Sequence, residues 1–103
     1  MVVVPHQRVY WVYIMTNKSN SVYYIGMTNN IRRRVIEHRS RIPPESFTSR
    51  YNVFKLIYTE TYRSPIAAIR REKKLKRWKR AWKQALIEEE NPAYEDLLPD
   101  LYP

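Results

Sequence analysis

Five residues of this chain have side chains that could take part in a chemical reaction: Tyr13, Tyr24, Arg34, His38 and Glu72. An arginine guanidinium is a fixed fork of donors that matches phosphate oxygens. A histidine titrates near neutral pH, so it can position a phosphate or shuttle a proton. A carboxylate that faces a protein core is costly unless it is paired or bound to a metal ion. Together these residue types indicate phosphate-directed chemistry.

The two tyrosines fall in segments that are predicted to form an antiparallel β-hairpin. Residues 9–16 and 21–27 are rich in aromatic and β-branched side chains, and turn-forming residues 17–20 lie between them. If the hairpin turns symmetrically, Tyr13 lies directly opposite Tyr24, and opposed residues share one face of a sheet. The two phenols could then serve one site. A tyrosine in a strand is more often a core residue, and that interpretation stays open.

Gly26, the single glycine of the chain, ends the second of these segments. Glycine in a strand weakens it and often marks a bulge or the close approach of another group to the backbone. The alternatives are a simple kink at the strand end and a position where something must lie against the backbone.

A helix is predicted to follow, capped by Asn29 or Asn30 and running to about residue 40. At about 100° per residue, Ile31 and Val35 form one apolar stripe, and His38 lies within it. His38 is therefore either a hydrogen-bonded residue at the margin of the core or a residue of a site.

Arginines surround that stripe. Arg34 lies at its edge, one turn before His38, and Arg41 lies a further turn on. The alternative interpretation is a solvated basic face, and it applies to Arg32, Arg33, Arg34, Arg39 and Arg41.

A second helix is predicted to begin at Ser64 and Pro65, a capping serine followed by proline at the first helical position. Glu72 falls inside the apolar face of this helix by the same angular count. That face is formed by Ala68, Ile69 and Leu75. Glu72 is therefore either a metal ligand or half of an ion pair with a nearby arginine.

The remaining segments complete the architecture. Residues 42–46 contain two prolines and break the first helix, and residues 53–60 predict a third strand. Helical composition then continues to residue 90, with a break near residues 76–79, and Asn91-Pro92 ends it. We expect an α+β fold, a small three-stranded antiparallel sheet flanked by helices in the order β-β-α-β-α-α.

Composition limits the classes of protein. Nineteen Lys and Arg against ten Asp and Glu give a net charge of +9, which attracts polyanions such as nucleic acid. A basic surface kept for solubility, or contact with ribosomes or anionic lipid, is the alternative. The chain has no cysteine, which excludes disulfides and thiolate chemistry. No apolar run approaches the roughly 20 residues of a membrane span. We expect one cytoplasmic domain, residues 1–103, with a core over about residues 9–91 and a tail over 92–103.

Taken together, the motifs resemble the GIY-YIG nuclease superfamily, which includes homing endonucleases, restriction enzymes and the incision subunit of bacterial excision repair. The resemblance is carried, in chain order, by Trp11-Val12-Tyr13, Tyr24-Ile25-Gly26, Asn30-Ile31 before Arg34, then His38 and Glu72. It is closest to the short, stand-alone bacterial endonuclease type, whose helix reads much like residues 70–76 followed by a tryptophan, here Trp78.

The resemblance implies a metal-dependent endonuclease that cleaves a nucleic-acid phosphodiester, with DNA as the first expectation and one divalent ion, Mg²⁺ or Mn²⁺. Tyr13 and Tyr24 would orient or activate the attacking water, one of them as the general base. Arg34 would stabilise charge on the phosphate, His38 would assist, and Glu72 would hold the metal. Further contacts to nucleic acid are predicted for Gly26, Arg33, Arg41 and Asn91.

The sequence departs from the family pattern at Trp11, which replaces the first glycine of the name motif, and at Met27, where some relatives have a lysine thought to help activate the tyrosine or water. The competing interpretation is a nucleic-acid-binding module that keeps the fold with little or no catalysis. A basic scaffold that binds proteins is a third interpretation. It rests on the charge and on Trp78 and Trp82, which are expected to be helix-packing residues.

Overall fold

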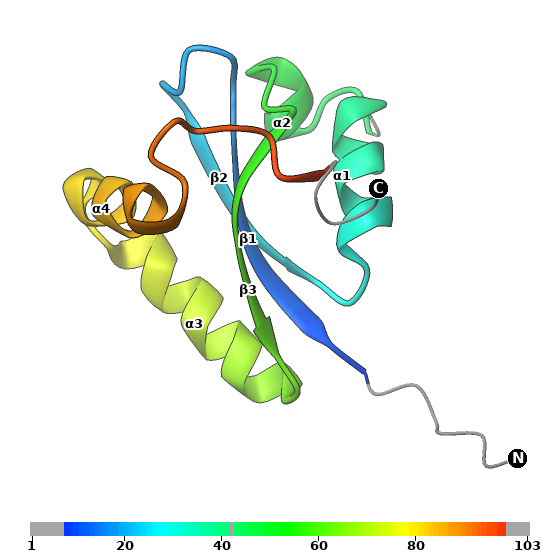
Figure 1. Ribbon diagram of the computed structural model, residues 1–103. Coiled ribbons are helices and arrows are strands. Elements are labelled where there is room, and N and C mark those ends of the chain that lie inside the picture. Colours follow the sequence, from blue (N-terminus) through cyan, green and yellow to red (C-terminus); the bar gives the residue numbers. More distant parts are fainter. Residues whose placement is uncertain (1–7, 42, 99–103) are drawn as a thin grey trace, which may run out of the picture.

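The computed structural model describes residues 8–41 and 43–98. Its sheet contains β1 (Tyr10–Thr16), β2 (Tyr23–Thr28) and β3 (Lys55–Tyr62), in the spatial order β2-β1-β3. Both neighbours of β1 are antiparallel to it. The predicted α+β architecture is confirmed (Figure 1).

β1 is the central strand because both of its faces are apolar. Val12 and Ile14 point to one side of the sheet, and Tyr13 and Met15 point to the other. All four are buried, which a strand covered on both faces requires. Helices supply that cover on each side.

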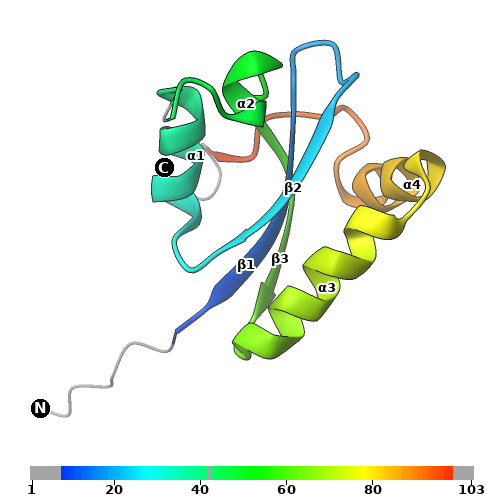
Figure 2. The ribbon, with the colours of Figure 1, turned by 180° about the vertical axis from the view of Figure 1, so that it is seen from behind.

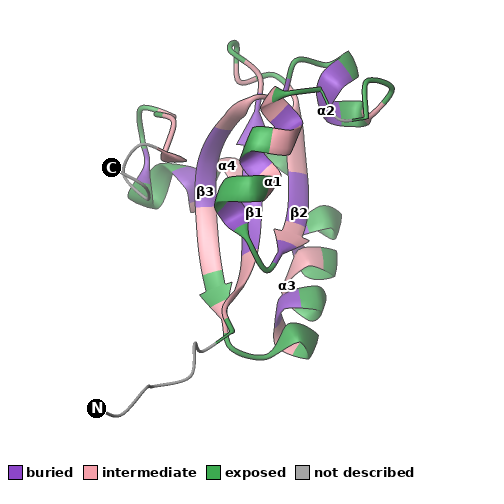
Figure 3. Cartoon of the chain, turned by 90° about the vertical axis from the view of Figure 1, so that its right-hand side faces the viewer, coloured by how far each residue is buried: buried purple, intermediate pink, exposed green. Residues whose placement is uncertain are grey.

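The first face is covered by α1 (Ile31–Arg39), whose N-terminus is capped by the side chain of Asn30. A one-turn helix, α2 (Phe47–Arg50), follows with Ser46 as its cap. It lies within a stretch for which no helix was predicted. Ile31 and Val35 pack onto Tyr13 and its neighbours, as the apolar stripe predicted. Figure 3 looks onto this face and shows buried residues along the strands beneath α1.

The second face is covered by α3 (Pro65–Arg77) and α4 (Arg80–Glu90), which lie on the side of the sheet away from α1 (Figure 2). Ser64 caps α3, and the break before α4 falls at Trp78 and Lys79, as the composition predicted. Ala68 and Leu75 enter the core against Val12 and Ile14. Ile69 is exposed, contrary to prediction, because it lies at the margin of this face.

The two tryptophans that were expected to pack between helices, Trp78 and Trp82, differ in burial. Trp78 packs against the core between the sheet and α3, and Arg71 lies over its ring. Trp82 is exposed, so its prediction as a packing residue is wrong, although its ring meets that of Trp78 edge to face. α4 turns Trp82 outward because its buried contact is made through Ile87.

The segment after α4 is docked on the sheet as far as residue 98. Asn91 is buried and donates its amide to the Ile57 carbonyl at 3.0 Å. The Leu97 amide donates to the Leu56 carbonyl at 2.8 Å. The rest of the predicted tail, residues 99–103, lies outside the described residues.

Candidate active site

The register of the hairpin differs from the symmetric prediction. Tyr13 pairs with Gly26, and Tyr24 pairs with Met15. The offset arises because the Asn17 side chain accepts the amides of Ser21 and Val22, which delays the start of β2. A shift of one residue would move Tyr24 to the other face, whereas a shift of two keeps it beside Tyr13. The predicted pair of phenols on one face therefore survives.

Gly26 is the residue over which the Tyr13 ring lies. A Cβ atom at this position would overlap the hydroxyl and ring carbons of Tyr13. The close approach that the glycine indicated is thus made by a side chain of the same protein. Gly26 is buried beneath that ring, and its contact to nucleic acid stays a prediction. Its contribution is the space that lets Tyr13 lie flat on the hairpin.

Tyr13, His38 and Thr48 form a continuous chain of hydrogen bonds beneath α1. The Tyr13 hydroxyl is 3.0 Å from His38 Nε2, and His38 Nδ1 is 2.8 Å from Thr48 Oγ1. His38 is only 3% exposed, so both ring nitrogens are satisfied inside the protein. Of the two interpretations of His38, the structure shows a hydrogen-bonded core histidine that also touches a predicted site residue.

The surroundings of Tyr13 and His38 keep both side chains neutral. Burial, followed by the positive charge of Arg34, lowers the pKa of His38 to about 4. Burial and the neighbouring Tyr24 raise the pKa of Tyr13 above its usual range, although Arg34 opposes the shift. A neutral imidazole has one donor and one acceptor nitrogen. If Nδ1–H donates to Thr48, Nε2 accepts from the Tyr13 hydroxyl.

Arg34 lies at the open side of this chain. Its side chain is half-buried, and one guanidinium nitrogen is 3.3 Å from Glu37 Oε2. Burial would lower the pKa of Arg34, but hydrogen bonding and charge interaction with Tyr13 and Tyr24 outweigh it, so that its pKa is raised. The guanidinium therefore lies close enough to both phenols to interact with them.

Tyr24 connects the buried chain to the surface. Its ring centroid is 6.2 Å from that of Tyr13 and 5.1 Å from that of His38. On its outer side it meets the ring of Phe47 at 6.1 Å. Tyr24 also lines a groove of about 350 Å³.

That groove, which we call the edge groove, follows the outer edge of β2. Among the described residues β2 pairs only with β1, so its other edge is open. Phe47 and Tyr24 approach this edge from the α1 face, and Lys76 and Lys83 approach it from the other face. The lining residues are Tyr23, Tyr24, Ile25, Phe47, Lys76 and Lys83. The groove thus joins the two faces of the sheet around its free edge.

Glu72 stands on α3, across the sheet from Tyr13. Its Oε1 atom is 2.7 Å from Nζ of Lys76, and its side chain is 20% exposed. The ion-pair partner is a lysine of the same helix and not the arginine that the sequence analysis considered. Because Lys76 lines the edge groove, Glu72 lies one side chain away from the surface that Tyr24 also reaches.

A divalent ion would fit this carboxylate only with ligands from elsewhere. Among the described residues no group of three or more His, Cys, Asp and Glu side chains could hold a metal ion. Mg²⁺ commonly keeps several waters and takes only one or two protein carboxylates together with substrate phosphates. Glu72 matches that pattern as a single ligand, provided that it exchanges its contact with Lys76.

Three other predicted site residues make their contacts away from Tyr13, Tyr24 and His38. Arg33 is exposed and pairs with Glu37 at 3.4 Å. Arg41 donates to the Ser49 carbonyl and to the Asn52 side chain, so its guanidinium holds a loop together. The Asn91 amide and carbonyl bond backbone groups of Ile57 and Glu95, which assigns it a structural role.

Sequence reasoning missed Thr48 and Phe47, which α2 contributes to the site. The available signal was Ser46, a capping serine two residues after the proline pair. It also missed a polar cluster on the other face, where Glu60 binds Arg71 at 2.9 Å and accepts the hydroxyls of Tyr58 and Tyr62. This cluster satisfies a partly buried carboxylate and stands in the α3 layer, away from the tyrosine pair.

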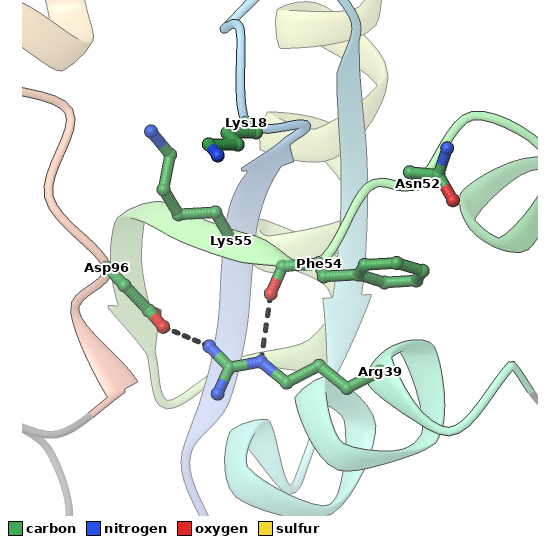
Figure 4. Close-up of a pocket in the computed structure, with 6 residues that line it drawn as sticks. All are labelled: Lys18, Arg39, Asn52, Phe54, Lys55 and Asp96. Carbon is green, nitrogen blue, oxygen red and sulfur yellow. Dashed lines mark hydrogen bonds and ion pairs between the residues drawn. The ribbon is translucent and has the colours of Figure 1, made fainter.

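A second, larger hollow of about 410 Å³ lies beside Arg39, the last residue of α1 (Figure 4). Arg39 crosses it, donating to the Phe54 carbonyl at 2.9 Å and to the Asp96 carboxylate. Lys18 and Lys55 stand above it. No residue of the predicted catalytic set lines it. The contacts of Arg39 with Phe54 and Asp96 hold the segment after α4 against the sheet.

The fold and the tyrosine cluster define a nuclease-type domain, and comparison with known families agrees. The model of the family described as GIY-YIG catalytic domain matches residues 9–85. The chain therefore belongs to the GIY-YIG family. It is 36% identical over 69 residues to a UPF0213 protein of Halobacterium salinarum, covering 67% of this chain and 88% of that protein. A UPF0213 protein of Staphylococcus haemolyticus is 34% identical over 80 residues, covering 78% and 95%.

A solved structure of a similar protein has the same fold. The solution NMR structure of a UPF0213 protein from Bacillus halodurans superposes with a TM-score of 0.54 at 29% identity, covering 87% of this chain and 94% of that one. Among the residues that the structure describes, no helix is long and apolar enough to cross a membrane.

Proposed function

We propose that this protein is a metal-dependent endonuclease that hydrolyses a phosphodiester of nucleic acid, with DNA as the expected substrate. The observation that carries the proposal is the position of Arg34 against the phenols of Tyr13 and Tyr24, at the mouth of the Tyr13–His38–Thr48 chain. Family membership supports it, because the matched model is that of a catalytic domain.

In the proposed reaction Arg34 binds the phosphate and offsets the negative charge that develops on its oxygens. Tyr24, which lines the edge groove, holds the attacking water or the phosphate through its hydroxyl. The Tyr13 hydroxyl can accept a hydrogen bond from that water while it donates to His38 Nε2. The neutral His38 imidazole therefore orients the Tyr13 oxygen toward that water.

Glu72 would hold the divalent ion, Mg²⁺ or Mn²⁺, which when bound would acidify a water and neutralise charge on the leaving oxygen. Lys76 would then leave its ion pair with Glu72 and could contact a phosphate from the same groove.

The second candidate function is a nucleic-acid-binding module without catalysis. One observation favours it: the Glu72 carboxylate is engaged by Lys76, which would have to yield before a metal could bind. The net charge of +9 serves binding and cleavage equally well.

A cleavage panel distinguishes the two functions. Branched, nicked, single-stranded and duplex DNA, together with RNA, are incubated with the protein in Mg²⁺, Mn²⁺ or EDTA. The nuclease predicts strand cleavage that requires a metal and is lost in Glu72→Gln and Arg34→Lys. Binding to these probes without cleavage under any metal condition would support the module instead.

A further inference from the structure

Two aromatic rings stand on the surface beside the candidate active site. Phe47 is 45% exposed and Tyr51 is 47% exposed, and their ring centroids are 4.7 Å apart. Both belong to α2 or its C-terminal cap. An isolated exposed apolar residue is ordinary, whereas two neighbouring exposed aromatics on a one-turn helix form a small apolar surface that a partner could cover.

These rings continue the line of rings that begins at the buried phenol. Tyr13 meets Tyr24, Tyr24 meets Phe47 at 6.1 Å, and Phe47 meets Tyr51. The same short helix places Thr48 inward on His38. α2 therefore ties the exposed rings mechanically to the hydrogen-bonded chain of the site, so that a group held on Phe47 is also placed relative to Tyr24.

Positive charge accompanies the rings. Lys76 and Lys83 line the edge groove together with Phe47, and Arg50 is exposed on α2 itself. Aromatic faces set beside a track of cations are the features by which proteins hold single-stranded nucleic acid, because the bases stack on the rings and the phosphates follow the charge. In a duplex the base faces are already covered by neighbouring bases, so only an unstacked base can use such a surface.

We propose that Phe47 and Tyr51 form a stacking platform for an unpaired base next to the phosphate that is cut. The substrate class is therefore nucleic acid with a single-stranded segment at the cleavage point, such as a flap or a tail, and not an intact duplex. This proposal rests on the proposed function for the position of the cut, but its binding step can be measured without cleavage.

The test is equilibrium binding in EDTA, followed by fluorescence anisotropy. The labelled probes are a blunt DNA duplex, the same duplex with a single-stranded tail, and that tailed duplex with abasic sugars in the tail. Phe47→Ala should weaken binding of the base-bearing tail by about 5- to 150-fold, the range measured for loss of one base–aromatic contact. Binding of the blunt duplex and of the abasic tail should stay within about twofold.

Three variants control the experiment. Phe47→Trp keeps an aromatic face and should retain tail binding, whereas Phe47→Leu keeps apolar area alone and should behave like Phe47→Ala. Ile36→Ala removes a side chain of the same 45% exposure from α1 and should change nothing. Far-ultraviolet circular dichroism and a thermal melt check that α2 still supports Thr48 in each variant.

The outcomes separate the platform from the nuclease. Equal loss of affinity for blunt, tailed and abasic probes overturns the platform while leaving the cleavage assay unaffected. A preference for base-bearing tails that vanishes in Phe47→Ala upholds it, even if the cleavage panel shows no metal-dependent cutting.

Discussion

The Tyr13 hydroxyl lies 3.0 Å from His38 Nε2, and this contact joins the central strand to the helix above it inside the protein. Because His38 is bonded on its other side to Thr48, neither partner can rotate away without leaving a buried polar group unpaired. The contact is therefore a structural support.

Stability should depend on the protonation of His38. Its pKa falls from 6.5 in the unfolded chain to about 4 in the folded protein, so the unfolded state binds more protons between these values. Stability is then full above pH 6.5 and decreases as pH falls towards 4, by about 3 kcal/mol at most. Urea melts across this range measure the loss.

His38→Gln is the matched variant for that experiment, because it should flatten the pH dependence even though it lowers stability at neutral pH. His6, the other histidine, lies outside the described residues and is replaced by glutamine in both proteins. An NMR titration that finds His38 protonating near its ordinary pKa would contradict the buried, neutral imidazole.

Arg34→Lys should reduce turnover by about a hundredfold or more, comparable to loss of one preorganised donor. Lysine keeps the charge but lacks the planar fork that fits two phosphate oxygens. Arg32→Lys and Arg33→Lys are the comparison, since both positions are exposed on α1. Steady-state cleavage rates decide the point. Similar losses at all three positions would indicate a general basic surface and favour the binding module.

Glu72→Gln should abolish metal-dependent cleavage with little effect on folding. The ion pair with Lys76 joins partly exposed side chains one turn apart, and such pairs contribute only about 0.3–0.5 kcal/mol. Lys76→Met breaks the same pair while keeping the carboxylate, so it isolates the structural effect. A Glu72→Gln protein that melts much earlier and still cuts would remove the metal-ligand assignment.

Gly26→Ala should destabilise the protein by about 1–3 kcal/mol, the usual cost of forcing atoms into a filled space. The added methyl group would meet the end of the Tyr13 ring. In a Tyr13→Leu background those atoms are absent, so most of the penalty should disappear. Thermal unfolding of the four proteins in this cycle gives the coupling. An equal penalty in both backgrounds would place the cause in the backbone and not in the ring.

The elements of the fold could be predicted because their signals are local. A run of aromatic and β-branched residues defined β1. Asn29 or Asn30 and Ser64 marked helix starts, and the structure has Asn30 and Ser64 as the caps. The register could not, because it depends on how Asn17 folds its side chain back onto the turn. The same limit explains Thr48, which lies ten positions after His38 and is brought to it by the intervening loop.

The candidate site was predicted in composition and only partly in arrangement. Tyr13, Tyr24, Arg34 and His38 share a face because strand alternation and helical periodicity are regular enough to project. The partner of Glu72 is the lysine one helical turn on, which periodicity allows but the sequence analysis did not consider. The relation of Glu72 to the tyrosines followed from neither rule, because it passes around a sheet edge.

The open edge of β2 has a consequence for how the protein would contact other molecules. Unpaired strand edges are where chains add to one another and build continuous sheets. Here that edge runs beneath the groove formed by Tyr24, Phe47 and Lys76. A second molecule that extended the sheet would fill the space that nucleic acid needs, and bound nucleic acid would keep the strand from such a neighbour. Sheet extension at this edge and nucleic-acid binding in the groove would therefore exclude each other.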